Sequence, residues 1–213
     1  MKYYDSRDGF EDPEHNILQH TPIALETIIK QTDDARESVA NQMPDTPLYL
    51  QGDMPDCLLQ CARMAEHRQV GIDPGLEVFK NMAIENGFYS SQWGVELRGF
   101  MEIIKDRPNI VAQLDYANGP QDLKTVLDQG ASVIAGVETH EYYHGLLNIE
   151  PNHGGHAVVV THVNESKDGF WQFIVNDPNE SIPNQEIDCC AFQKAWDVMN
   201  RMMITVRAKG DDS

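Results

Sequence analysis

The spacing of hydrophobic residues changes about halfway along the chain, from a helical pattern to short apolar runs. In the first half, apolar residues recur every three to four positions, which predicts helices over 21–43, 57–69, 74–87 and 92–106. In the second half, runs rich in valine, isoleucine and aromatic residues predict strands over 109–115, 131–138, 156–164, 170–177 and 202–208. Two further helical patterns, 119–130 and 189–201, lie between these strands. Helices first and an antiparallel sheet second predict an α+β fold.

Capping residues mark several of these boundaries. Asp56 and Asp188 are expected N-caps, because a short acidic side chain accepts hydrogen bonds from the first turn of the helix that follows it. Gly87 and Gly130 are expected to end the helices before them, since glycine adopts the left-handed conformation of a C-terminal cap. Residues 43–56 contain three prolines and are expected to form a loop.

The chain of 213 residues is long enough for one substantial core. Residues 1–20 are acidic and polar, and are expected to form a flexible arm. Residues 21–213 are expected to form a single domain, mostly helical over 21–105 and mostly sheet over 106–213.

The net charge limits the classes of binding partner, and the hydropathy of the chain limits its expected location in the cell. A formal net charge of -18 disfavours binding to nucleic acid or anionic lipid, which depends on Lys and Arg. No run of about 18 uncharged apolar residues predicts a membrane-spanning helix, and the polar N-terminus lacks the apolar core of a secretory signal. We therefore expect a protein that is cytoplasmic where it is made, or that is exported by a route that reads no such signal.

Four cysteines, at positions 57, 61, 189 and 190, are expected to be free thiols, because secreted disulfide frameworks usually space their cysteines apart. Cys57 opens a predicted helix, where the free N–H groups and the helix dipole favour a thiolate. Cys61 lies one turn later on the same face and is expected to line the core or the site.

The strands 156–164 and 170–177 flank a turn and predict a hairpin. If the turn is centred between Ser166 and Lys167, His156 lies directly opposite Asp177. Directly opposed residues have Cβ atoms about 4.5–5.5 Å apart, which is close enough for a hydrogen-bonded pair.

These residues fit the requirements of a cysteine nucleophile. Such a nucleophile needs a base to take its proton, a group to orient that base, and hydrogen-bond donors for the oxyanion. Cys57 is the candidate nucleophile, His156 the base and Asp177 the orienting group. Gln51, six residues before Cys57, is the candidate oxyanion donor.

The chain resembles papain-like cysteine peptidases of the C39 and C39-like group. The resemblance lies in the Gln-x5-Cys spacing with Asp directly before the cysteine, in "GGHAVVV" and in "VNDP", and it spans Gln51 to Asp177. It implies a papain-like fold, a peptide or protein amide as substrate, and the same four roles for Gln51, Cys57, His156 and Asp177. It also implies a stand-alone bacterial effector or toxin type, with a host target protein or a cognate inhibitor as partner, and no cofactor or metal.

Three alternatives stay open at this stage. The same attack on a glutamine side chain would make the protein a glutamine deamidase. The sequence "HEYYH" fits the H-E-x-x-H pattern, which on a helix binds zinc through its histidines. Since it follows a strand-like run, we expect instead a loop whose His140 and Tyr143, together with His153, touch substrate. A non-catalytic binding or adaptor protein is the third alternative.

Overall fold

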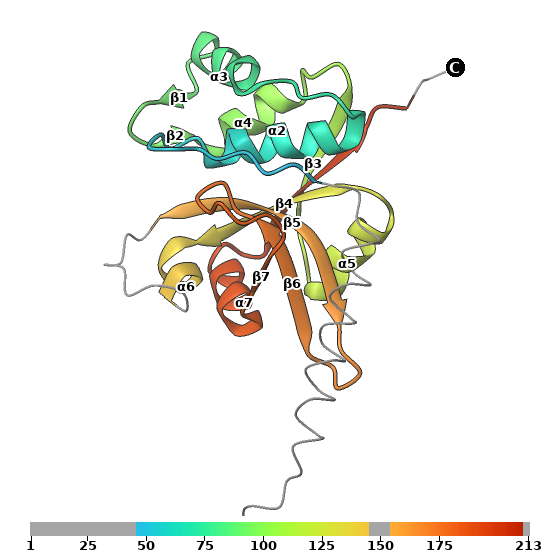
Figure 1. Ribbon diagram of the computed structural model, residues 1–213. Helices are drawn as coiled ribbons and strands as arrows, with labels where there is room; N and C mark the ends of the chain where they lie inside the picture. The colour runs from blue at the N-terminus through green and yellow to red at the C-terminus, as the bar shows by residue number, and fades with distance from the viewer. Residues whose placement is uncertain (1–45, 145–153, 211–213) are drawn as a thin grey trace, which may run out of the picture. The chain divides into compact units, whose positions relative to one another are not determined.

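The computed structural model describes residues 46–144 and 154–210, which lie within a compact unit spanning 44–213 (Figure 1). The predicted arm over 1–20 and the predicted helix over 21–43 lie outside the described residues. His153 also lies outside them.

Three helices form the first part of the described chain: α2 (Cys57–Val70), α3 (Leu76–Glu85) and α4 (Leu97–Ile104). The start of α2 agrees with the prediction. Helix α3 begins later than predicted, at Leu76, because Gly75 has a φ of +77°, which lies outside the helical range. Helix α4 is also shorter than predicted, because residues 89–95 form a small hairpin of β1 (Tyr89–Ser90) and β2 (Gly94–Val95).

The second part builds a six-stranded antiparallel sheet in the order β3-β8-β4-β5-β6-β7. The strands are β3 (Ile110–Tyr116), β4 (Ser132–Glu138), β5 (Gly155–Glu165), β6 (Trp171–Asn176), β7 (Gln185–Ile187) and β8 (Met202–Ala208). Five of them were predicted, and β7 was not, because three residues are too short to form a recognisable pattern. The α+β class with a helical N-terminal part on a C-terminal antiparallel sheet is thus confirmed.

Helices cover both faces of this sheet (Figure 1). On one face, α2, α3 and α4 pack on a core that includes Ile134, Ala157, Val159 and Ile204. On the other face lie α5 (Pro120–Asp128), α6 (Thr139–His144) and α7 (Cys189–Val198). Neighbouring residues of β4 and β5 contribute to opposite faces, as the two-residue period of a strand requires. The apolar run from Val133 to Val137 in β4 is explained by this burial on both sides.

Two other predictions about the second part are partly or wholly wrong. The β5–β6 hairpin exists, but its turn runs from Ser166 to Gly169 and is centred one residue later than predicted. A register shift between Val160 and His162 moves the pairing again, and the last pair is Val159 with Asn176. The predicted direct opposition of His156 and Asp177 is therefore wrong.

The segment with the H-E-x-x-H pattern is the second case. It was predicted to be a loop, but Thr139–His144 forms the short helix α6. A hydrogen bond from the backbone N–H of Glu141 to the Glu138 carboxylate helps to close its first turn. The strand β4 thus passes directly into a helix.

Candidate active site

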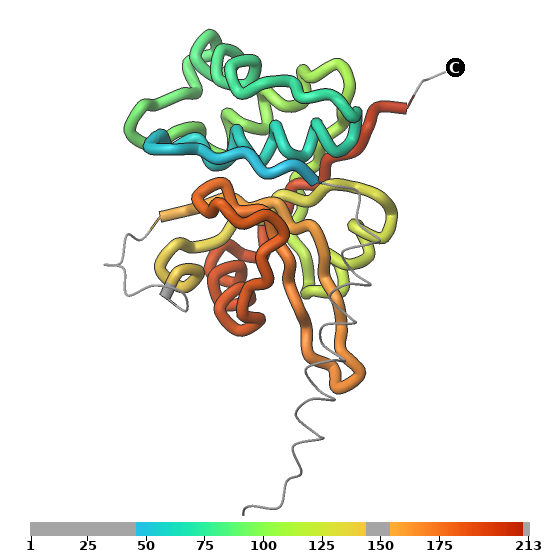
Figure 2. The backbone as a smooth tube through the Cα atoms, in the orientation of Figure 1, coloured from blue at the N-terminus to red at the C-terminus, as the bar shows by residue number. Residues whose placement is uncertain are grey.

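The segment before α2 forms hydrogen bonds to both parts of the fold. The Gln60 side chain donates a 2.7 Å hydrogen bond to the carbonyl of Leu50. The fully buried Asn176, the last residue of β6, donates a 2.8 Å bond to the carbonyl of Thr46. The backbone N–H of Gln51 bonds the carbonyl of Pro178 at 2.9 Å. The segment 46–56 therefore runs past the loop that follows β6 before it enters α2 (Figure 2).

Asp56 occupies the N-cap position of α2, but its side chain does not cap the helix. The buried carboxylate instead accepts a 2.9 Å bond from the Lys80 ammonium and a 2.8 Å bond from the Tyr89 hydroxyl. The first N–H groups of a helix have no partners within the helix. Because the Asp56 side chain does not bond them, they are available to the side chain of the residue that begins α2. That residue is Cys57.

His156 and Asp177 form a buried hydrogen-bonded pair. The distance from His156 Nε2 to Asp177 Oδ1 is 2.8 Å, and the two side chains are 4% and 0% exposed. Burial by itself would raise the pKa of Asp177, but the hydrogen bonds from His156, from the backbone of Asn179 and from Tyr143 lower it below its ordinary value. The carboxylate is thus held in its charged form beside the imidazole.

Cys57 lies on the other side of the imidazole. Burial would raise the pKa of the thiol, but hydrogen bonding to His156 and its charge, with backbone N–H groups of Leu58 and Ala157, lower it below its ordinary value. Burial would lower the pKa of His156, but the hydrogen bonds of Asp177 and Cys57 raise it to about 10. Since Nε2 faces Asp177, Nδ1 is the nitrogen left for the thiol. The three side chains are thus brought together in the order needed for a thiolate–imidazolium pair.

Gln51 lies at the same end of α2 as this cluster. Its backbone bond to Pro178 fixes it next to the residue that follows Asp177. Among the described residues, the buried Oε1 of Gln51 has no hydrogen-bond partner. The amide oxygen therefore has no competing hydrogen bond from the described residues.

Tyr143, for which substrate contact stays a prediction, contacts the aspartate. Its hydroxyl donates a 2.9 Å hydrogen bond to Asp177 Oδ2 and accepts a 3.0 Å bond from the Asn179 side chain. Its ring centroid lies 5.8 Å from that of His156. No sequence pattern singled out Asn179, although an aspartate side chain often accepts a hydrogen bond from the backbone N–H two residues later in a turn.

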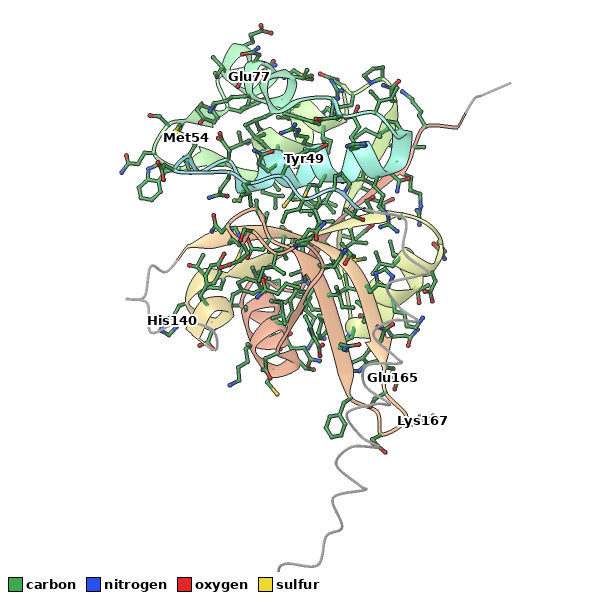
Figure 3. All side chains as sticks on the ribbon, in the orientation of Figure 1. Tyr49, Met54, Glu77, His140, Glu165 and Lys167 are labelled. Carbon is green, nitrogen blue, oxygen red and sulfur yellow. The ribbon has the colours of Figure 1, made fainter. Side chains whose placement is uncertain are left out.

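His140, from the H-E-x-x-H segment of the zinc alternative, lines a separate hollow. His140, labelled in Figure 3, lines a hollow of about 490 Å³ with Glu138, Glu141, Gly154 and Val198. The lining does not include Cys57 or Asp177. Within the described ranges 46–144 and 154–210, no three His, Cys, Asp or Glu side chains gather as a metal ion would require. In the same ranges, no helix has the length and apolar character to cross a membrane.

Comparisons with known proteins bear on the family resemblance and on the fold. A sequence model described as "Peptidase_C39 like family" matches residues 105–204. No curated protein matches the chain. One similar solved structure is that of a candidate C39-like peptidase from Bacillus anthracis, with 16% sequence identity and a TM-score of 0.56, covering 78% of this chain and 96% of that chain. At this identity the likeness concerns the fold. The family match, over the part of the chain that holds His156 and Asp177, and the shared fold together confirm the resemblance to the C39-like group of peptidases.

Proposed function

We propose that the chain is a cysteine peptidase in which Cys57 is the nucleophile, His156 the base and Asp177 the residue that orients the base. One observation carries this proposal. The imidazole bonds a carboxylate at 2.8 Å and interacts with a half-buried thiol, with a lowered pKa for Cys57 and a raised pKa for His156. Perturbed pKa values of this paired kind favour a thiolate nucleophile at neutral pH.

In the first half of the reaction, the Cys57 thiolate attacks the carbonyl carbon of a peptide bond. The carbonyl π bond opens to an oxyanion, for which the backbone N–H of Cys57 and the side-chain amide of Gln51 are the proposed donors. The oxyanion then collapses and the C–N bond breaks. The leaving nitrogen takes the proton from His156, and a thioester on Cys57 remains.

In the second half, water attacks the thioester and gives a proton to His156. The C–S bond breaks, the acid product leaves, and the thiolate–imidazolium pair is restored. Asp177 keeps the imidazole in one orientation throughout, and its charge stabilises the protonated ring. No proton needs to pass to Asp177.

The test is the pH dependence of alkylation of each cysteine by iodoacetamide, read by mass spectrometry. In the wild type, Cys57 is expected to react fastest among the four thiols, with an apparent pKa well below about 8.5, the ordinary thiol value. His156→Ala is expected to raise that pKa. If Cys57 reacts no faster than the exposed Cys190, the proposal is wrong.

The same chemistry on a glutamine side chain would be deamidation, and a substrate screen distinguishes the two. New chain termini in the products mean peptide cleavage, whereas conversion of glutamine to glutamate in an uncut product means deamidase activity. The effector or toxin type, with a host target or a cognate inhibitor, stays a prediction and calls for the same screen with proteins from other cells. A purely adaptor role would leave partner binding intact after Cys57 is alkylated.

A further inference from the structure

We infer that Tyr143 and Asn179 are positioning residues, which hold Asp177 in the orientation that His156 needs: the Tyr143 hydroxyl bonds the carboxylate oxygen that does not face the imidazole, and the Asn179 side chain bonds that hydroxyl. This inference rests on the proposed function of the Cys57 site. It also gives a role to a residue of the H-E-x-x-H segment that differs from both metal binding and substrate contact.

The carboxylate of Asp177 is bonded on both oxygens. Oδ1 accepts from His156 Nε2 at 2.8 Å and from the backbone N–H of Asn179 at 2.8 Å. Oδ2 accepts from the Tyr143 hydroxyl at 2.9 Å. The Asn179 side chain in turn donates to the Tyr143 hydroxyl at 3.0 Å, so that the hydroxyl proton is directed toward Asp177. A carboxylate bound at both oxygens cannot rotate about its Cβ–Cγ bond without losing a hydrogen bond.

The aromatic pair of α6 places the hydroxyl. Tyr142 is fully buried, and its ring meets that of Tyr143 edge-on, with centroids 4.9 Å apart. Both rings also lie against the imidazole of His156, with centroids 6.2 and 5.8 Å away. Tyr143 therefore packs beside the base and bonds the orienting group at the same time. A loop at these residues would hold the hydroxyl less firmly than a helix end packed in this way.

Within 46–144 and 154–210, few other groups that titrate surround Asp177. The groups that shift its pKa, or whose pKa it shifts, are His156 from β5, Tyr142 and Tyr143 from α6, and Cys61 from α2. The charge of Glu180 also raises the pKa of Tyr143. Burial and the nearby carboxylate raise the pKa of Tyr143 far above its ordinary value, so its hydroxyl stays a donor across the working pH range.

The experiment uses the full chain with Tyr143→Phe, which keeps the ring and removes only the hydroxyl. Losing a hydrogen bond to a charged carboxylate raises the pKa of Asp177 and lets the group turn, so the imidazolium is less stabilised and the pKa of Cys57 rises. We expect the alkylation rate of Cys57 to fall roughly tenfold on the acid side of its pH profile. At alkaline pH, where the thiolate forms without help, the rate should equal that of the wild type. With a peptide substrate, kcat should fall while KM stays the same.

Two further variants make the result specific. Tyr49→Phe also removes a hydrogen-bonded tyrosine hydroxyl, which lies 2.6 Å from His67 Nδ1 on the α2 side of the molecule (Figure 3), and it should leave the acid side of the profile unchanged. Asn179→Ala keeps the backbone bond to Asp177 and should give a smaller shift in the same direction as Tyr143→Phe.

The outcomes separate this inference from the proposed function. If wild-type Cys57 has an ordinary thiol pKa, the proposed function fails. If wild-type Cys57 has a low pKa and Tyr143→Phe has the same profile, the inference alone is overturned. If Tyr143→Phe exposes all four thiols at equal rates, the variant has unfolded, and Asn179→Ala then decides: an unshifted profile overturns the inference and a shifted one supports it.

Discussion

The carboxylate of Asp56 bonds the Lys80 ammonium at 2.9 Å instead of the open N-terminus of the helix that Cys57 begins. The Tyr89 hydroxyl completes this arrangement at 2.8 Å. An N-cap side chain usually accepts a hydrogen bond from the second or third N–H of its helix. Here the acidic side chain is turned into the α3 side of the core, and the N–H groups around the thiol are not blocked by a neighbouring carboxylate.

The first prediction concerns this ion pair. Lys80→Met keeps the length of the side chain but leaves the buried Asp56 carboxylate with the tyrosine hydroxyl alone. We expect the free energy of unfolding to fall by about 1–3 kcal/mol, because a buried charge loses a partner. Urea unfolding measures this. Lys105→Met is the control, since its pair with Glu102 is half exposed and should contribute less than about 1 kcal/mol.

The second prediction is a pH window of stability from the His156–Asp177 pair. The pKa of His156 is raised, so stability from its protonated form is full below its ordinary value of 6.5 and is lost as the pH rises toward about 10. The pKa of Asp177 is lowered, so its contribution is full above its ordinary value of 3.8 and is lost as the pH falls below that value. The pair should therefore stabilise the fold most between these two ordinary values.

Asp177→Asn tests this window. Relative to the wild type, its free energy of unfolding should be lower by about 3 kcal/mol near pH 5. The difference should shrink on both the acid and the alkaline side. Urea unfolding of both proteins at several pH values measures it. A difference that stays constant across pH would mean that the pair contributes by packing and not by charge.

The third prediction concerns the close approach of Gly94 to the loop before Cys57. Gly94 has a φ of +71°, and a Cβ built on it would lie 1.9 Å from the carbonyl oxygen of Pro55. Gly94→Ala should therefore push residues 55–57 away from their positions. We expect a loss of stability of more than about 2 kcal/mol and slower alkylation of Cys57 at neutral pH.

Gly169→Ala is the matched control for this variant. Gly169 has a similar φ of +79°, but nothing lies within 4 Å of its added Cβ. Its cost should be limited to about 1–2 kcal/mol of backbone strain, and Cys57 should react as in the wild type. Equal effects of the two substitutions on Cys57 would show that the contact with Pro55 does not position the thiol.

The sequence predicted most of the elements because their patterns were long and regular. The strand β4 is a continuous buried run after Gly130, and the helix α2 keeps one spacing of buried residues until Gly71 ends it. The Asp188 side chain caps α7 as predicted, with a 2.9 Å bond from the backbone N–H of Ala191. In each case local propensity and burial favour the same structure.

The errors occurred where tertiary contacts decide the outcome. A residue added to β5 near Thr161, whose hydroxyl bonds the carbonyl of Ile174, changes the hairpin register without any signal in the alternation. His156 and Asp177 were nevertheless brought together, because their side chains reach each other beyond the last strand pair. The α6 helix could not be predicted, since six residues are too few to show a helical period.

The fourth prediction concerns Cys61, which was expected to line the core or the site. It is fully buried one turn after Cys57, and its thiol contacts the carbonyl of Ala157 at 3.2 Å. Burial and the nearby Cys57 and Asp177 raise its pKa well above the ordinary value, so it is a poor nucleophile. Cys61→Ala should lower the free energy of unfolding by about 1–2 kcal/mol and leave the alkylation profile of Cys57 unchanged.

Wild-type Cys61 should therefore resist iodoacetamide in the folded protein and react only in denaturant. A redox role for the pair would give a different result, because mild oxidation would then join Cys57 to Cys61 and block alkylation of both until a reductant is added. Mass spectrometry of the oxidised protein, before and after digestion, distinguishes a Cys57–Cys61 disulfide from a reduced Cys61. A buried thiol with a raised pKa forms little thiolate, which is the form that attacks an oxidised sulfur. We therefore expect Cys57 to be oxidised alone, with Cys61 still reduced.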